Sequence, residues 1–234
     1  MTINPYIDPN WAWFANFAIL FCVFLVIIFS GVFIGHAYRQ IRLSDRYWAI
    51  VFAPLALALW AGAAIATSLS IKLQIYWFLP FALAPILLGT AASFSRVGAR
   101  LLAETPTHWM IALQSYRVLG ALFLFPYMAQ GVLTPGFAWP AGVGDVITGV
   151  AAPFVALCVL RDPQRWRGLF YAWTFFGIAD LIVAPLSAVI FGFGAEGRQL
   201  TFAVTAIPLF LGPPFGILIH ILTWRSFELR RKAA

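Results

Sequence analysis

The sequence predicts an all-α membrane protein, a polytopic bundle of seven transmembrane helices, and three observations support this fold class. First, 62% of the 234 residues are hydrophobic and only 10% are charged, whereas a soluble domain carries about 25% charged residues. Second, the apolar residues gather in stretches of the ~20 residues that a helix needs to cross a bilayer. Third, no stretch shows the alternating pattern of a membrane β-barrel, and an open sheet cannot satisfy its backbone in lipid.

Seven stretches meet the length requirement for a membrane-spanning helix. They cover residues 11–35, 48–68, 75–94, 109–130, 139–160, 168–193 and 200–224. The segments that connect them are short, so no soluble domain fits between two spans. We therefore expect residues 1–234 to form a single transmembrane domain.

The distribution of basic residues predicts the orientation. Of the fifteen Lys and Arg residues, twelve follow the first, third or fifth stretch or lie in the C-terminal tail: Arg39, Arg42, Arg46, Arg96, Arg100, Arg161, Arg165, Arg167, Arg225, Arg230, Arg231 and Lys232. Cytoplasmic segments of membrane proteins are enriched in such residues. We expect an outside N-terminus, a cytoplasmic C-terminus and a multi-pass protein of the plasma membrane, the inner membrane of a bacterium.

The net charge of +7 is then explained by topology, and a nucleic-acid partner is not expected. The partners that this architecture predicts are the lipid bilayer and a small polar solute or a proton. The sequence leaves oligomer formation open.

Tryptophan and proline positions of the first three stretches recur in the same order in the last three, at an offset near 128 residues. The matched positions include Trp13 with Trp139, Pro54 with Pro185, Pro80 with Pro208 and Pro85 with Pro213. The offset predicts a 3+1+3 arrangement, in which parallel repeats at 11–96 and 139–226 are linked by a helix at 108–130. The alternative is that these residue types recur by chance in an apolar composition.

Four ionisable residues lie inside the apolar stretches and are the candidate functional residues. They are Arg117, Asp145, Asp180 and His220. An ionisable group near the bilayer centre costs about 2.5–3.5 kcal/mol on insertion scales, so it marks a functional site by default. Gln114 joins the set because a residue three positions from Arg117 lies on the same helix face.

Small residues at three- and four-residue steps share the helix faces of Asp145, Asp180 and His220. Small faces allow helices to approach closely, so we expect one polar cluster in the second half of the bundle. Arg117 is the expected partner of one or both aspartates, because an unpaired buried charge is costly. Two interpretations stay open: a structural pair that fixes helix register, or a site for a polar solute or a proton.

Glycine and proline residues suggest two breaks in the helices. The segment 131–145, GVLTPGFAWPAGVGD, holds two prolines and four glycines, and we expect a bent entry that places Asp145 near an unwound turn with free backbone amides. Pro208, Pro213 and Pro214 are expected to divide the seventh span into two halves. A broken seventh span would be the moving part of a transporter.

Gly142-Val-Gly-Asp145 resembles the Gly-x-Gly-Asp motif of intramembrane aspartyl proteases, and Asp180 offers a second carboxylate. The resemblance implies a pair of aspartates that activates water, although the motif's aspartate follows its partner in presenilin-like enzymes and precedes it here. No metal or nucleotide motif is present, so no metal ligand or catalytic residue is assigned. Any cofactor stays unknown, with His36, His108 and His220 as candidate haem ligands.

A longer pattern, Tyr116-Arg117-x-x-Gly120 followed by Gly-x-Leu-x-Pro-Gly-Phe-Ala-x-Pro-Ala-Gly-x-Gly-Asp over residues 131–145, resembles small uncharacterised bacterial integral membrane proteins. The resemblance covers about thirty residues and implies no activity. It singles out Arg117 and Asp145, together with Gly142 and Gly144 as structural glycines.

The leading hypothesis is therefore a membrane protein that transports or senses a small polar solute or a proton through a buried Arg/Asp cluster. Arg117 and Asp145 would form the outward-side charge pair, and Asp180 would be the deeper titrating group. The alternatives are an intramembrane aspartate-dependent hydrolase and a non-catalytic membrane subunit or scaffold, and the sequence favours a protein that is not an enzyme.

Overall fold

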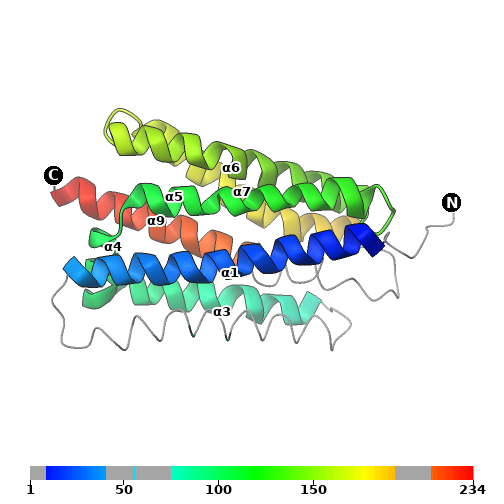
Figure 1. The fold of residues 1–234 in the computed structure, drawn as a ribbon, viewed down its shortest axis with the longest axis horizontal. Coiled ribbons are helices and arrows are strands. Elements are labelled where there is room, and N and C mark those ends of the chain that lie inside the picture. The colour runs from blue at the N-terminus through cyan, green and yellow to red at the C-terminus, as the bar shows by residue number, and fades with distance from the viewer. Residues whose placement is uncertain (1–8, 41–54, 56–58, 60–74, 193–211, 234) are drawn as a thin grey trace.

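The computed structural model describes residues 9–40, 55, 59, 75–192 and 212–233, and in this part of the chain the elements are helices, with no strand among them (Figure 1). The all-α prediction is confirmed for these residues. The α-helices are α1 (Pro9–Gln40), α3 (Ile75–Phe94), α4 (Arg96–Glu104), α5 (Thr107–Leu113), α6 (Pro135–Arg161), α7 (Arg167–Phe191) and α9 (Pro213–Ala233). Between α5 and α6 lie a 3-10 helix, η1 (Gln114–Gly120), and a π-helix, η2 (Phe123–Met128).

Four of the described segments are long and apolar enough to cross a membrane, namely Phe17–Ala37, Thr107–Met128, Pro135–Arg161 and Arg167–Phe191. The bent pair Leu83–Phe94 and Arg96–Glu104 raises this number to five if it forms one span. These helices correspond to the first, third, fourth, fifth and sixth predicted stretches. Outside the described residues lie the second stretch, at 48–68, except for Leu55 and Leu59, and residues 200–211 of the seventh.

The third predicted stretch coincides with α3, but the segment after it is a helix and not a loop. The chain bends by 89° between α3 and α4. Ser95 caps α4, because its hydroxyl accepts a hydrogen bond from the Gly98 N–H at 3.0 Å. Leu102 of α4 is buried, whereas Arg96 and Arg100 are exposed.

The predicted unwound entry to the fifth span is wrong. Helix α6 is continuous from Pro135 to Arg161, and Asp145 lies in its interior. Pro135 occupies the first turn, where a backbone N–H has no partner within the helix and its loss is therefore tolerated. The backbone amides around Asp145 consequently belong to the helix and are not free to bind an anion.

Helix α9 begins at Pro213 and continues to Ala233, nine residues beyond the predicted end of the seventh span at 224. Pro213 is again compatible with a helix start. Pro208 and the predicted outer half of this span fall outside the described residues, so the expected break stays a prediction.

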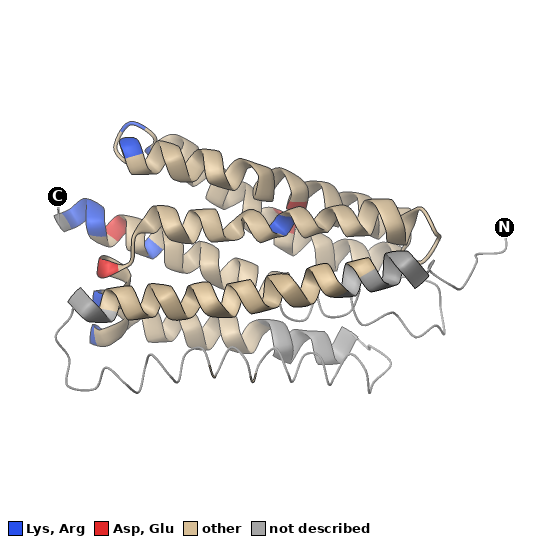
Figure 2. Ribbon diagram, viewed as in Figure 1, with Lys and Arg blue, Asp and Glu red and all other residues tan. Residues whose placement is uncertain are grey.

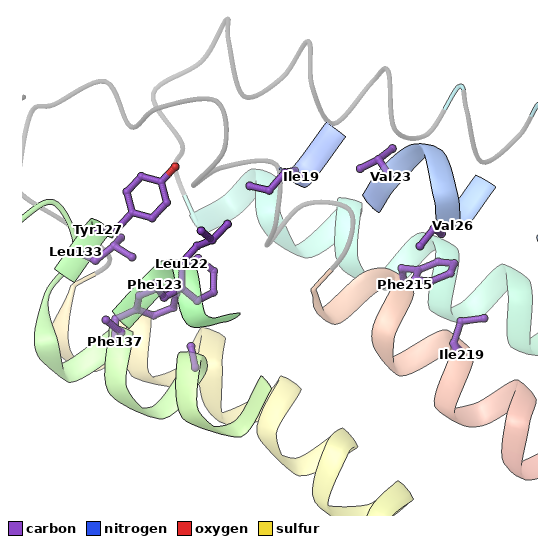
Figure 3. Close-up of a cluster of buried hydrophobic side chains, with 12 residues drawn as sticks. Ile19, Val23, Val26, Leu122, Phe123, Tyr127, Leu133, Phe137, Phe215 and Ile219 are labelled. Carbon is purple, nitrogen blue, oxygen red and sulfur yellow. The ribbon is translucent and has the colours of Figure 1, made fainter. Parts of the chain in front are cut away.

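Two apolar clusters form the described core. In the first, Ile19, Val23 and Val26 of α1 belong to one cluster with side chains from η2, α6 and α9 (Figure 3). The second joins Ile111 of α5 to the C-terminal half of α6, the start of α7 and Phe227 of α9. Along the chain, Arg117 lies between Ile111 and Leu122, Asp145 between Ala141 and Ala152, and His220 between Ile219 and Phe227, so these site residues lie between the two clusters.

Candidate functional site

Arg117 lies on an irregular part of its span. The chain from Thr107 to Met128 is α-helical up to Leu113, 3-10 up to Gly120 and a π-helix from Phe123, whereas the sequence predicts a regular helix. Pro126 lies inside the π-helix, and because proline has no N–H it cannot make the regular hydrogen bond there. Departures of this kind within a helix often occur at functional sites.

The guanidinium of Arg117 binds both aspartates, where the sequence predicts one or both. Its Nε donates to Asp145 Oδ1 at 2.7 Å, its Nη2 donates to Asp180 Oδ2, and its Nη1 donates to the Gly177 carbonyl at 3.1 Å. The Arg117 side chain is 1% exposed, against 12% for Asp145 and 6% for Asp180. The three charges therefore form one buried ionic cluster that joins η1, α6 and α7.

His220 and Gln114 extend this cluster onto α9. His220 Nε2 lies 3.3 Å from Arg117 Nη1, and because a guanidinium only donates, the histidine must accept there and carry its proton on Nδ1. Gln114 Nε2 donates to the carbonyl of Gly216, one turn before His220, at 3.1 Å. The structure thus brings all five predicted polar residues together around Arg117 and α9.

Both predicted structural glycines lie where a side chain would collide with the site. A Cβ on Gly144 would fall 1.7 Å from Asp180 Oδ1, and a Cβ on Gly142 would fall 2.9 Å from the Gly120 carbonyl oxygen. Only glycine lets α6 approach α7 and η1 this closely. These two residues therefore make room for the carboxylate and the backbone that complete the cluster.

Sequence reasoning missed other residues of the site. A Cβ on Gly177 would lie 2.3 Å from His220 Nε2, and a Cβ on Gly120 would lie 2.4 Å from the Asp145 Cβ. The ring of Trp173 packs 4.8 Å from that of His220, and its Nε1 donates to the Thr148 carbonyl at 3.1 Å. Their spacing in the sequence could have identified two of these residues. Gly177 precedes Asp180 by three residues and Thr148 follows Asp145 by three, and residues three apart share a helix face.

Several buried polar atoms of this region have no hydrogen-bond partner within the described part of the chain. They are Gln114 Oε1, Thr148 Oγ1, Thr174 Oγ1 and His220 Nδ1, and their residues are at most 5% exposed. Such atoms are rare in folded proteins because each costs roughly 1–3 kcal/mol. The site therefore has unused hydrogen-bonding capacity next to its charges.

The cluster carries a net charge of −1 when His220 is neutral, since one guanidinium faces two carboxylates. A net charge in a medium of low polarity favours uptake of a compensating charge. Among the described residues, no group of three His, Cys, Asp or Glu side chains could hold a metal ion. The three candidate haem ligands lie in different surroundings. His36 and His108 contact the ring of Trp109, whereas His220 belongs to the ionic cluster.

Comparison with known proteins gives a match to a protein family. Residues 77–226 match a family model that is described as a domain of unknown function, DUF8737. The matched region includes every residue of the ionic cluster. No curated protein and no solved structure matches the chain.

Proposed function

The chain belongs to the DUF8737 family of unknown function, and from the site itself we propose that this protein transports or senses a small polar solute or a proton in the bacterial inner membrane. The buried cluster of Arg117, Asp145 and Asp180 is the site of this function. Gln114 and His220 complete its polar lining.

The proposed topology has seven spans, an outside N-terminus and a cytoplasmic C-terminus. Figure 2 supports it, because most charged residues of the described part gather at one end of the bundle and a small group of opposite charges lies midway along it. The four or five candidate spans are compatible with this plan. The positive-inside rule assigns the charged end to the cytoplasm.

The observation that carries the proposal is a guanidinium shared by two carboxylates inside the bundle. Ionisable groups at this depth are expensive and commonly mark solute or ion pathways. The three charges come from three different elements, η1, α6 and α7. A change in their protonation or binding state would therefore alter how these elements pack, which is what both transport and sensing require.

The test uses the purified full chain in proteoliposomes. Entrapped pyranine reports proton movement, and the melting temperature in detergent reports binding of amino acids, sugars and monovalent ions. We expect Arg117→Ala and Asp145→Asn to abolish the wild-type response while the protein still inserts. Arg231→Gln, which removes an exposed arginine at the chain's C-terminal end, is the matched control. An unchanged response in both cluster variants would overturn the proposal.

A hydrolase is the second candidate, because Asp145 and Asp180 both contact the Arg117 guanidinium and their carboxylates therefore lie close to each other. Aspartate-dependent hydrolysis requires one carboxyl group to carry a proton and act as an acid. Cleavage of a fluorogenic transmembrane peptide by the wild type, and its loss in Asp180→Asn, would favour this function over transport.

The third interpretation is a scaffold in which the charges only hold the helices together. Replacing all three charges at once, as Arg117→Met with Asp145→Asn and Asp180→Asn, leaves no unpaired charge, and such replacements are often tolerated. If this triple variant folds and retains the wild-type response, the charges are structural. We expect it to fold and to lose the response.

A further inference from the structure

We infer that the species handled by the cluster is a proton, and that Thr148, Thr174 and His220 form a hydrated position through which it reaches the carboxylates. This inference rests on the proposed function and names its ligand. Two independent observations support it: the charge balance of the cluster and the polar atoms beside it that lack a partner among the described residues.

The charge balance favours a monovalent positive species. Among the ionisable groups, Arg117 of η1 contacts Asp145 of α6, Asp180 of α7 and His220 of α9, and the Tyr116 hydroxyl of η1 lies beside Gly216, one turn before His220. Helix α3, which also packs on α9, contains no Lys, Arg, Asp or Glu. Helix α4, which packs on α9 as well, contains Arg96, Arg100 and Glu104, and its two arginines are exposed. The cluster thus retains a charge of −1 that one proton neutralises.

A proton suits this site better than a larger cation. The guanidinium occupies the space between the two carboxylates, so a metal ion there would face a fixed positive charge. Asp180 Oδ1 lies against the backbone at Gly144, which leaves little room for a coordination shell. A proton needs no coordination shell, because it binds to one carboxylate oxygen.

The hydrated position is assigned to three side chains that are connected through Trp173. Its Nε1 bonds to the Thr148 carbonyl, its ring packs on His220, and Thr174 follows it directly in α7. The two threonine hydroxyls and His220 Nδ1 are buried without a partner in the described part of the protein. A buried water is stable when it has two to four such partners.

The proton transfer balances without any further reactant. A hydronium ion at the hydrated position loses a proton, one O–H bond breaks, and an O–H bond forms on a carboxylate oxygen of the cluster. Water remains at the hydrated position and the cluster changes from −1 to 0. Loss of the ionic bond to Arg117 then loosens the link between η1 and α6 or α7, which couples proton binding to helix packing.

The experiment measures proton flux in pyranine-loaded proteoliposomes of the full chain, driven by a potassium diffusion potential. We expect the double variant Thr148→Val with Thr174→Val to lose at least about tenfold in flux, because proton transfer depends on positioned polar groups. Thr90→Val is the matched control, since Thr90 Oγ1 is also buried without a described partner but lies on α3. The pair Thr148→Ser with Thr174→Ser keeps both hydroxyls and should retain the flux even if the valine pair fails to fold.

Three outcomes would contradict the inference, and each of them leaves the proposed function standing. If the wild type moves no protons but binds sodium ions or a polar solute, and Arg117→Ala abolishes that binding, the ligand is wrong and the cluster is still the site. If the valine pair matches the wild type while Arg117→Ala is inactive, the hydrated position is wrong. If the serine pair also loses the flux, the hydroxyl groups do not carry it.

Discussion

At the residue scale, the described site depends on how completely the Arg117 guanidinium is bound. It contacts two carboxylates, one backbone carbonyl and one imidazole. Removing one member of a buried ion pair costs about 3–5 kcal/mol, because the remaining charge stays buried without a partner. Small changes in the surrounding backbone therefore have large effects on the site.

Gly144→Ala tests this dependence without removing a charge. The added Cβ would lie 1.7 Å from Asp180 Oδ1, so the carboxylate must move away from Arg117. We expect a loss of stability on the order of the 3–5 kcal/mol of a broken buried pair, measured as a lower melting temperature in detergent. Gly168→Ala is the control, because its Cβ would meet no atom within 4 Å. Equal melting temperatures for both variants would contradict the geometry.

At the scale of single elements, close backbone contact shapes the irregular fourth span. A Cβ on Gly149 would lie 2.6 Å from the Val118 backbone nitrogen, and a Cβ on Gly142 would lie 2.9 Å from the Gly120 carbonyl oxygen. Helix α6 thus touches the backbone of η1 twice in the C-terminal half of the 3-10 segment. Arg117 directly precedes the first of these contacts, and its side chain binds Asp145 of α6.

Helix α4 has a side-chain cap at its N-terminus. The Ser95 hydroxyl accepts the Gly98 N–H, and loss of such a cap typically costs about 1 kcal/mol. We expect Ser95→Ala to increase amide hydrogen exchange in residues 96–104 and to leave exchange in α6 unchanged. Ser95→Asp retains a capping oxygen and should preserve the protection. Unaltered exchange in Ser95→Ala would show that packing alone holds α4.

The contact between α7 and the end of α9 should make stability depend on pH. Hydrogen bonds from the Tyr171 hydroxyl and from Arg231 lower the pKa of Glu228 below the usual value of about 4.3. A lowered pKa in the folded state means that the ionised group stabilises the protein above the unfolded pKa, and that this contribution is lost as the pH falls through the folded pKa.

We therefore expect the melting temperature of the wild type to exceed that of Glu228→Gln at pH 7, and the difference to shrink as the pH falls to about 4 and below. The measurement is thermal unfolding in detergent across this range. A difference that is independent of pH would mean that the charge of Glu228 is not involved.

At the scale of the whole molecule, the proposed topology makes a direct prediction. With seven spans and an outside N-terminus, a green fluorescent protein fused to the C-terminus should fluoresce in bacterial cells, and alkaline phosphatase at the same position should be inactive. The basic end of the bundle is the physical reason, because Lys and Arg near a span resist translocation. An active phosphatase fusion would mean an even number of spans or the opposite orientation.

The repeat of 11–96 and 139–226 stays a prediction, because two of the prolines on which it rests, Pro54 and Pro208, lie outside the described residues.

The sequence by itself determined the helical class, the limits of α3, α6 and α7 to within a few residues, and the fact that Arg117, Asp145 and Asp180 lie inside apolar helices. These properties are local, because hydropathy and helix length are read from neighbouring residues. The tertiary structure decided that one guanidinium binds both aspartates, that His220 joins them and that η1 is a 3-10 helix. Arg117 is separated from its partners by 28, 63 and 103 positions, and only the packing of helices against glycine surfaces determines which of these groups meet.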